Sequence, residues 1–139
     1  MTWFEVYNRI FQQIKVILES IEEIEDVNLG GAFRITSLPL VTVIPRETRI
    51  SQVAVSKTLR CDLIFDIIVF IRETEPEDWF SEIILPMGRV FDAFISNRTL
   101  NNTVLDLIPS IFSPGEITAL NRLYYGGLIR FQAVFHFTY

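Results

Sequence analysis

The segment Leu59–Arg72 reads LRCDLIFDIIVFIR, and its alternating pattern is typical of a β-strand with one face in a hydrophobic core. Every second position is apolar, namely Leu59, Cys61, Leu63, Phe65, Ile67, Val69 and Ile71. The positions between them mix charged and large apolar side chains, namely Arg60, Asp62, Ile64, Asp66, Ile68, Phe70 and Arg72. This second face is suited neither to water nor to a core. At about 3.3 Å per residue the strand would be more than about 40 Å long, so we expect it to extend beyond the core.

Residues 1–25 are predicted to form one amphipathic helix. Thr2 and Glu5 have the spacing of a capping box at its start. The apolar stripe is wide and short, which favours a helix lying on a sheet over the alternative of a coiled coil. Its main positions follow alternating spacings of four and three, namely Trp3, Tyr7, Ile10, Ile14, Ile17, Ile21 and Ile24.

The middle of the chain combines strand and helix signals. Two strands are predicted before the long strand, Val41–Ile44 and Ile50–Ser56. The charged segment between them, Pro45–Arg49, is interpreted as a loop. Thr74–Glu77 carries the start signals of a second helix. Pro86 lies inside that helix, so we expect a kink or a break there.

The last third of the chain is predicted to form strands. Pro109 suits an edge strand or a bulge. Pro114–Gly115 predicts a turn, and Gly126–Gly127 predicts a two-residue hairpin. The predicted strands are Val104–Phe112, Glu116–Tyr125 and Leu128–Tyr139.

This order of elements predicts the α+β class, with a mostly antiparallel sheet, a long N-terminal helix and a second helix packed on one face. A length of 139 residues fits a single domain over residues 1–139. Half of the residues are hydrophobic, and only 21% are charged. Such a small domain is expected to turn some apolar surface toward a partner.

Charge and composition exclude several classes of protein. The net charge of −5 argues against binding a phosphate backbone, which needs a basic surface. Cys61 is the only cysteine, so no internal disulfide can form. No run of 18 apolar residues is present, which argues against a membrane span. The start lacks the basic region of a signal peptide, so we expect synthesis in a cytoplasm.

Catalytic chemistry finds little support. His136, the only histidine, has no evident catalytic partner, and Cys61 lies on the apolar face, where a thiol acts as a small hydrophobe. Asp62 and Asp66 would be about 13 Å apart along a strand, too far for a glycosidase pair. Asp66 could act as a lone base, but solvation, or pairing with Arg60 or an adjacent subunit, is the favoured interpretation. No catalytic, cofactor-binding or metal-binding residue is predicted.

The residues instead favour a subunit that assembles with copies of itself. The mixed face of Leu59–Arg72 is predicted to be the subunit interface, where its hydrophobes are buried against a neighbour and its charges set the register. Arg46, Glu47 and Arg49 are interpreted either as a solvated hairpin loop or as a loop that docks on a partner protein.

Several short stretches in this order resemble one family. They are IEDV at Ile24–Val27, PLVTVIP at Pro39–Pro45, the long alternating strand, TLNNTV at Thr99–Val104 and FQAVFHF at Phe131–Phe137. Together they cover nearly the whole chain, which resembles the tail terminator (tail completion) proteins of long-tailed bacteriophages and related neck proteins.

The resemblance implies a structural virion protein without a cofactor. Members form a hexameric ring that caps the tail tube, ends its polymerisation and joins the head connector. It therefore implies three partners: further copies of the chain, the tail-tube protein and the head–tail connector protein. DNA would pass through the ring without specific binding, which suits an acidic chain.

Two alternatives stay open from the sequence. One is another component of the neck, such as a connector or stopper protein. The other is a small-ligand-binding or enzymatic α+β domain with a pocket between the sheet and the first helix.

Overall fold

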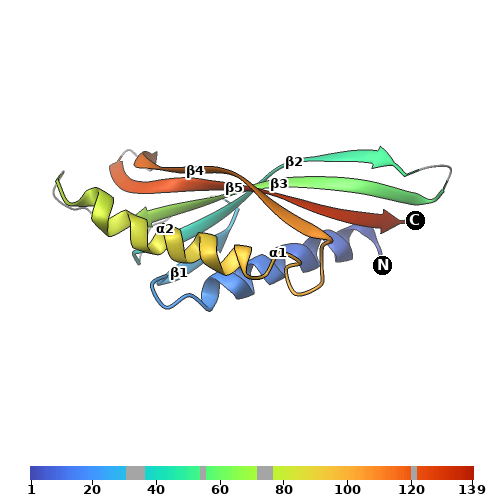
Figure 1. Ribbon diagram of the computed structural model, residues 1–139, viewed down its shortest axis with the longest axis horizontal. Helices are drawn as coiled ribbons and strands as arrows, with labels where there is room; N and C mark the ends of the chain where they lie inside the picture. Colours follow the sequence, from blue (N-terminus) through green and yellow to red (C-terminus); the bar gives the residue numbers. More distant parts are fainter. Residues whose placement is uncertain (31–36, 54–55, 72–76, 120–121) are drawn as a thin grey trace.

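The computed structural model describes residues 1–30, 37–53, 56–71, 77–119 and 122–139. The helices are α1 (Trp3–Glu19) and α2 (Trp79–Ile95). The strands are β1 (Asp26–Leu29), β2 (Leu40–Gln52), β3 (Thr58–Ile71), β4 (Asp106–Ala119) and β5 (Arg122–Thr138). They form one sheet in the order β1-β2-β3-β5-β4, antiparallel throughout except for β1, which lies parallel to β2. Both helices cover the same face of the sheet, which confirms the α+β class (Figure 1).

The central strand β3 confirms the prediction made from its alternation. All seven residues of its apolar face belong to the main core or pack against it. Phe65 lies at the centre of this core, with its ring 6.2 Å from Phe11 of α1, 6.4 Å from Phe94 of α2 and 5.8 Å from Phe131 of β5. The core therefore lies between the middle of β3 and the two helices.

The sheet also extends past the helices, as expected from the length of β3. Figure 1 shows the paired ends of β2 and β3 projecting beyond the start of α1. Side chains there lie largely in solvent, and Ile50 is 54% exposed although it is on the helix side of the sheet. Within the described residues, no helix has both the length and the apolar character needed to cross a membrane.

The first helix begins as predicted and ends early. The side chain of Thr2 accepts a hydrogen bond of 3.2 Å from the backbone N–H of Glu5. The helix ends at Glu19 rather than near residue 25. Ile21 and Ile24 nevertheless stay in the core, because the irregular turn after the helix folds them back onto the sheet.

Several sequence predictions of breaks in regular structure are wrong. Pro45–Arg49 is not a loop, because β2 continues through it with a bulge between Pro45 and Thr48. Pro114–Gly115 is not a turn but part of β4, and Gly126–Gly127 lies inside β5 rather than in a hairpin turn. At Pro86 only the predicted break is wrong, because α2 continues through this residue as one helix whose buried face packs on the sheet. Pro109 does lie next to a bulge, in the edge strand β4, as predicted.

The residue at position 127, inside β5, is a glycine because no side chain fits there. A Cβ atom at this position would come 2.7 Å from the backbone oxygen of Ser113 and would also overlap the buried sulfur end of Met87. We therefore expect Gly127→Ala to lower the free energy of unfolding by about 1–3 kcal/mol. The matched control is Gly115→Ala in β4, where the added methyl meets no atom within 4 Å. Urea unfolding of both variants tests this, and equal stabilities would contradict it.

Candidate functional site

The candidate site is the open face, by which we mean the sheet face turned away from both helices (Figure 1). The strand register sets one row of side chains straight across it. Ile44 of β2 lies opposite Asp66 of β3, Asp66 opposite Arg130 of β5, and Arg130 opposite Ile111 of β4. A carboxylate and a guanidinium therefore stand at the centre of the face, with an isoleucine on either side.

Asp66 is held by two arginines of its own chain. Arg130 donates from Nε to Oδ1 at 2.7 Å and from Nη2 to Oδ2 at 3.0 Å. Arg46 donates from Nε to Oδ2 at 2.7 Å. The side chain of Asp66 is 0% exposed, whereas those of Arg46 and Arg130 are 44% and 35% exposed. The two arginines thus shield the carboxylate and keep their own outer atoms in water.

Burial and pairing act in opposite directions on this group. Burial alone would raise the pKa of the Asp66 carboxyl, but the hydrogen bonds and positive charges of Arg130 and Arg46 outweigh it, so that the pKa lies below its usual range. The same contact raises the pKa of Arg130. The carboxylate is therefore ionised at neutral pH, and the cluster of one anion and two cations carries a net charge of +1.

The bulge in β2 brings Arg46 to this cluster. Between Pro45 and Thr48 the strand holds extra residues that have no partner on β3. A bulge re-aims side chains, and here Arg46 reaches Asp66 on the open face. The signals that predicted a loop at this point, a proline and a run of charges, are thus the signals of a bulge.

An apolar patch surrounds the charged cluster. Ile108 and Ile111 of the edge strand β4 are 40% and 38% exposed, and the other members are partly exposed. No described helix or strand of the chain covers these side chains on this face (Figure 1). We call this set the open-face patch, and its members are Ile44, Ile64, Ile68, Ile108, Ile111 and Leu128.

The predicted interface residues of β3 divide into two groups. Arg60, Asp62 and Ile64 lie on the open face and reach solvent, with Arg60 Nε 3.4 Å from Asp62 Oδ1. Ile68 is partly exposed.

Two other residues of the predicted interface make their contacts within the chain. Asp66 pairs with Arg46 and Arg130 rather than with Arg60 or a neighbouring subunit. Phe70 is only 3% exposed because it packs in a small cluster with Leu40 and Tyr124. Arg72 lies outside the described residues.

The predicted docking loop is wrong as a loop. Arg46, Glu47 and Arg49 lie inside β2. Arg46 is committed to Asp66, while Arg49 and Glu47 form an exposed ion pair of 3.0 Å with each other. Such exposed pairs contribute little to stability.

Sequence reasoning missed the residues that complete the open face from β4 and β5. Arg130, Ile108 and Ile111 become neighbours of Asp66 only through strand pairing. Alternation within its own segment was the available signal for Arg130, whereas Ile108 and Ile111 are three residues apart and share the open face only because of the bulge between Pro109 and Ile111. The hairpin predicted at Gly126–Gly127 also gave the wrong register.

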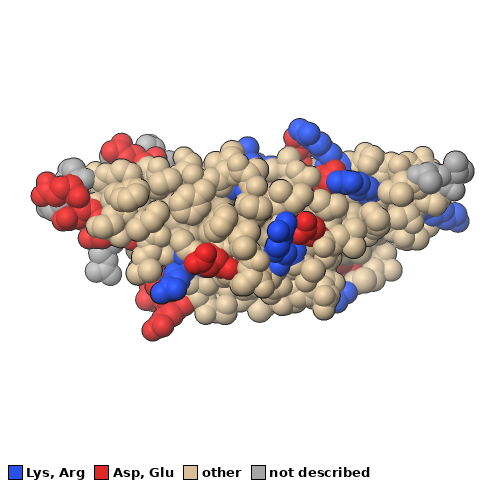
Figure 2. Space-filling view, viewed as in Figure 1, with Lys and Arg blue, Asp and Glu red and all other residues tan. Residues whose placement is uncertain are grey.

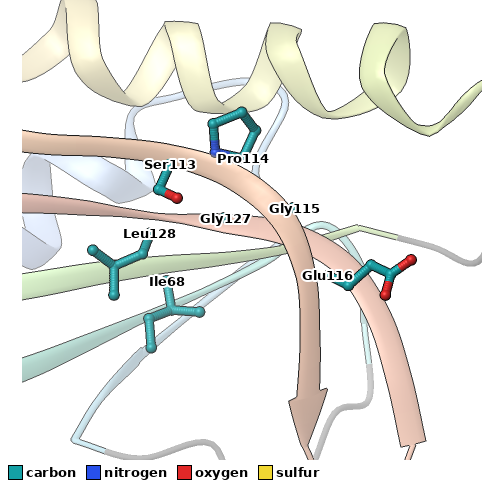
Figure 3. Close-up of a pocket in the computed structure, with 7 residues that line it drawn as sticks. All are labelled: Ile68, Ser113, Pro114, Gly115, Glu116, Gly127 and Leu128. Carbon is teal, nitrogen blue, oxygen red and sulfur yellow. The ribbon is translucent and has the colours of Figure 1, made fainter.

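Shallow hollows adjoin the sheet, among them one of about 390 Å³ lined by Leu38, Pro39, Ile71, Ser81, Glu82 and Leu85. Two others lie nearer to the predicted sites. One, of about 270 Å³, lies where β4 and β5 curve near Gly115 and Gly127 (Figure 3). Of its described lining residues only Glu116 is charged. The other, of about 280 Å³, lies beside α1, near where the sequence analysis allowed a ligand pocket, and is lined mainly by apolar side chains such as Phe4 and Leu29.

The remaining candidates for chemistry, His136 and Cys61, lie on opposite faces of the sheet. His136 is exposed on β5. Cys61 is wholly buried. Burial raises the pKa of its thiol, and the negative charge of Asp62 raises it further. Among the described residues, no three His, Cys, Asp or Glu side chains are grouped so that they could hold a metal ion. Comparison with models of protein families gives no match, and comparison with curated proteins gives none either.

Proposed function

We propose that this protein is a structural virion subunit that forms a ring at the head-proximal end of a phage tail. In that position it ends polymerisation of the tail tube and provides the surface that joins the head connector. The resemblance of its ordered sequence stretches to tail terminator proteins supports this proposal, and so does the α+β fold with its helices on one face. A connector or stopper protein of the same neck is the second candidate, on the same support.

One observation carries the proposal. The open-face patch exposes isoleucines around a charged cluster whose central carboxylate is already neutralised within the chain. A surface of apolar side chains with exposed arginines, and with its carboxylate already paired, resembles an interface between subunits, whose core is apolar and enriched in Arg. A self-assembling subunit needs such a surface, and the role proposed for it requires neither catalysis nor a cofactor.

Size-exclusion chromatography with light scattering, followed by electron microscopy, tests this proposal. We expect the protein to form rings at high concentration or on addition of purified tail tubes. A strict monomer under both conditions would contradict the proposal. Cryo-electron microscopy of the assembled particle distinguishes a ring on the tail tube from one on the connector.

We expect Ile64→Arg to lower the association constant at least about tenfold. The arginine would place an unpaired charge in the open-face patch, beside the cation cluster of Arg46 and Arg130, and the cost would exceed about 1.4 kcal/mol. The control is Val16→Arg on the outer side of α1, where the native valine is 53% exposed and lies away from the patch. Sedimentation velocity across a concentration series measures both constants, and an equal loss in the two variants would contradict the role of the patch.

A further inference from the structure

A second apolar surface lies on the opposite side of the molecule, on the outer side of α2. Phe80, Ile84 and Leu85 are 54%, 38% and 51% exposed there. Phe80, Ile84 and Gly88 follow a spacing of four residues, which places them along one line of the helix. We call Phe80, Ile84, Leu85 and Gly88 the outer strip. Figure 2 shows that the face formed by α2 and β4 carries few charged side chains.

Gly88 lowers the stability of α2, and no described residue packs closely against this position. Glycine inside a helix is destabilising relative to alanine. A Cβ atom at Gly88 would meet no atom within 4 Å, so none of the residues that the structure describes requires a glycine there. A neighbouring surface that approaches the helix closely would require it.

Acidic side chains accompany the outer strip. Glu77, Asp78 and Glu82 at the start of α2 are exposed and form no ion pair with any residue that the structure describes. Figure 2 shows acidic residues gathered at this end of the molecule. The open face has the opposite character, because its cluster of Arg46, Asp66 and Arg130 carries a net positive charge.

We propose that the outer strip of one copy docks on the open-face patch of the next copy. Apolar side chains would meet on both sides of the contact. The acidic start of α2 would approach Arg46, which donates its Nε–H to Asp66 and has a side chain that is 44% exposed.

The two surfaces differ and lie on opposite sides of the sheet, so the contact is heterologous. Each docked copy presents a fresh open face, and the chain of contacts closes into a ring when the rotation between copies permits it. This inference rests on the proposed function, because it names the surfaces through which the proposed ring is built.

Cysteine cross-linking between separate batches tests the contact. Native Cys61 is wholly buried and leaves the surface free of thiols. One batch carries Ile64→Cys on the open face, and the other carries Ile84→Cys on the outer strip together with a tag that changes its mass. After mixing and mild oxidation at a concentration at which the wild type assembles, we expect a disulfide dimer of mixed mass and little dimer in either batch alone.

The outcomes separate this inference from the proposed function. A dimer of the Ile64→Cys batch alone would show open face against open face and overturn the inference, as would no mixed dimer from an assembling protein. In either case the proposed ring-forming function keeps its own test. A wild-type protein that stays monomeric with and without tail tubes would overturn both.

Gly88→Ala gives an independent test in which stability and assembly change in opposite directions. The substitution is expected to raise Tm by about 2–4 °C, because it improves helix propensity in open space. It is also expected to weaken association about tenfold, because the methyl group holds the neighbouring sheet away. Thermal unfolding and sedimentation velocity measure the two effects, and a raised Tm with unchanged association would exclude Gly88 from the contact.

Discussion

Asp66→Ala is expected to lower the free energy of unfolding by about 2–3 kcal/mol. Removing one partner of a buried ion pair leaves the others uncompensated, which costs about 3–5 kcal/mol when they are fully buried. Here Arg46 and Arg130 are 44% and 35% exposed, so water relieves part of that cost. The measurement is urea unfolding at neutral pH, extrapolated to water.

The matched control for this prediction is Asp62→Ala, four residues earlier on the same face. Asp62 is 21% exposed and has one longer contact, 3.4 Å to Arg60. Its loss is expected to cost less than about 1 kcal/mol. Equal losses at the two positions would show that the cluster around Asp66 does not hold the sheet together.

Acid titration checks the same contact through its charge. The folded-state pKa of Asp66 lies below the unfolded value of about 3.9. Its contribution is therefore complete well above pH 4 and is lost as the pH falls through the folded-state pKa. Below about pH 4 the wild type should lose stability more steeply than Asp66→Asn, which has no carboxyl to protonate. Parallel profiles for the two proteins would contradict the pairing.

Phe65→Ala is expected to lower the free energy of unfolding by about 3–5 kcal/mol. The side chain is wholly buried, and its ring contacts the rings of Phe11, Phe94 and Phe131. Its removal leaves a cavity where both helices meet the central strand. A typical domain of this size has a total stability of about 5–15 kcal/mol, so a large fraction is at stake.

The measurement is again urea unfolding, with Phe4→Ala as the control. Phe4 is 73% exposed at the start of α1, so its truncation is expected to change stability by less than about 0.5 kcal/mol. A loss below about 1.5 kcal/mol for Phe65→Ala would show that the helices can close around the cavity.

The sequence alone predicted the structure correctly where the signal lies within one short segment. The alternation of β3 identified its core face, and the capping signal at Thr2 located the start of α1. It misled where the same residues suit two structures. Pro45 and Pro114 lie inside strands because bulges and edge positions tolerate proline as turns do. Gly127 serves close packing rather than a turn.

The open face shows why the candidate site was only partly predictable. β3 alone revealed a mixed face with two aspartates, but the partner of Asp66 lies on a strand far away in sequence. The strand register determines which charged side chain is neutralised inside the chain. The residue pattern of a single segment does not reveal that register. The sequence therefore assigned Asp66 and Phe70 to a neighbour, whereas both are satisfied by their own chain.

The pairing of β3 with β5 also has a consequence for synthesis of the chain. It joins Thr58 to Thr138, which are 80 residues apart, and places Arg130 beside Asp66. The central strand of the sheet thus receives its second neighbour only after β5, Arg122–Thr138, has left the ribosome. Until then one edge of β3 and the carboxylate of Asp66 lack their final partners. A nascent or truncated chain without β5 should accordingly be prone to aggregate, since unpaired strand edges recruit other chains.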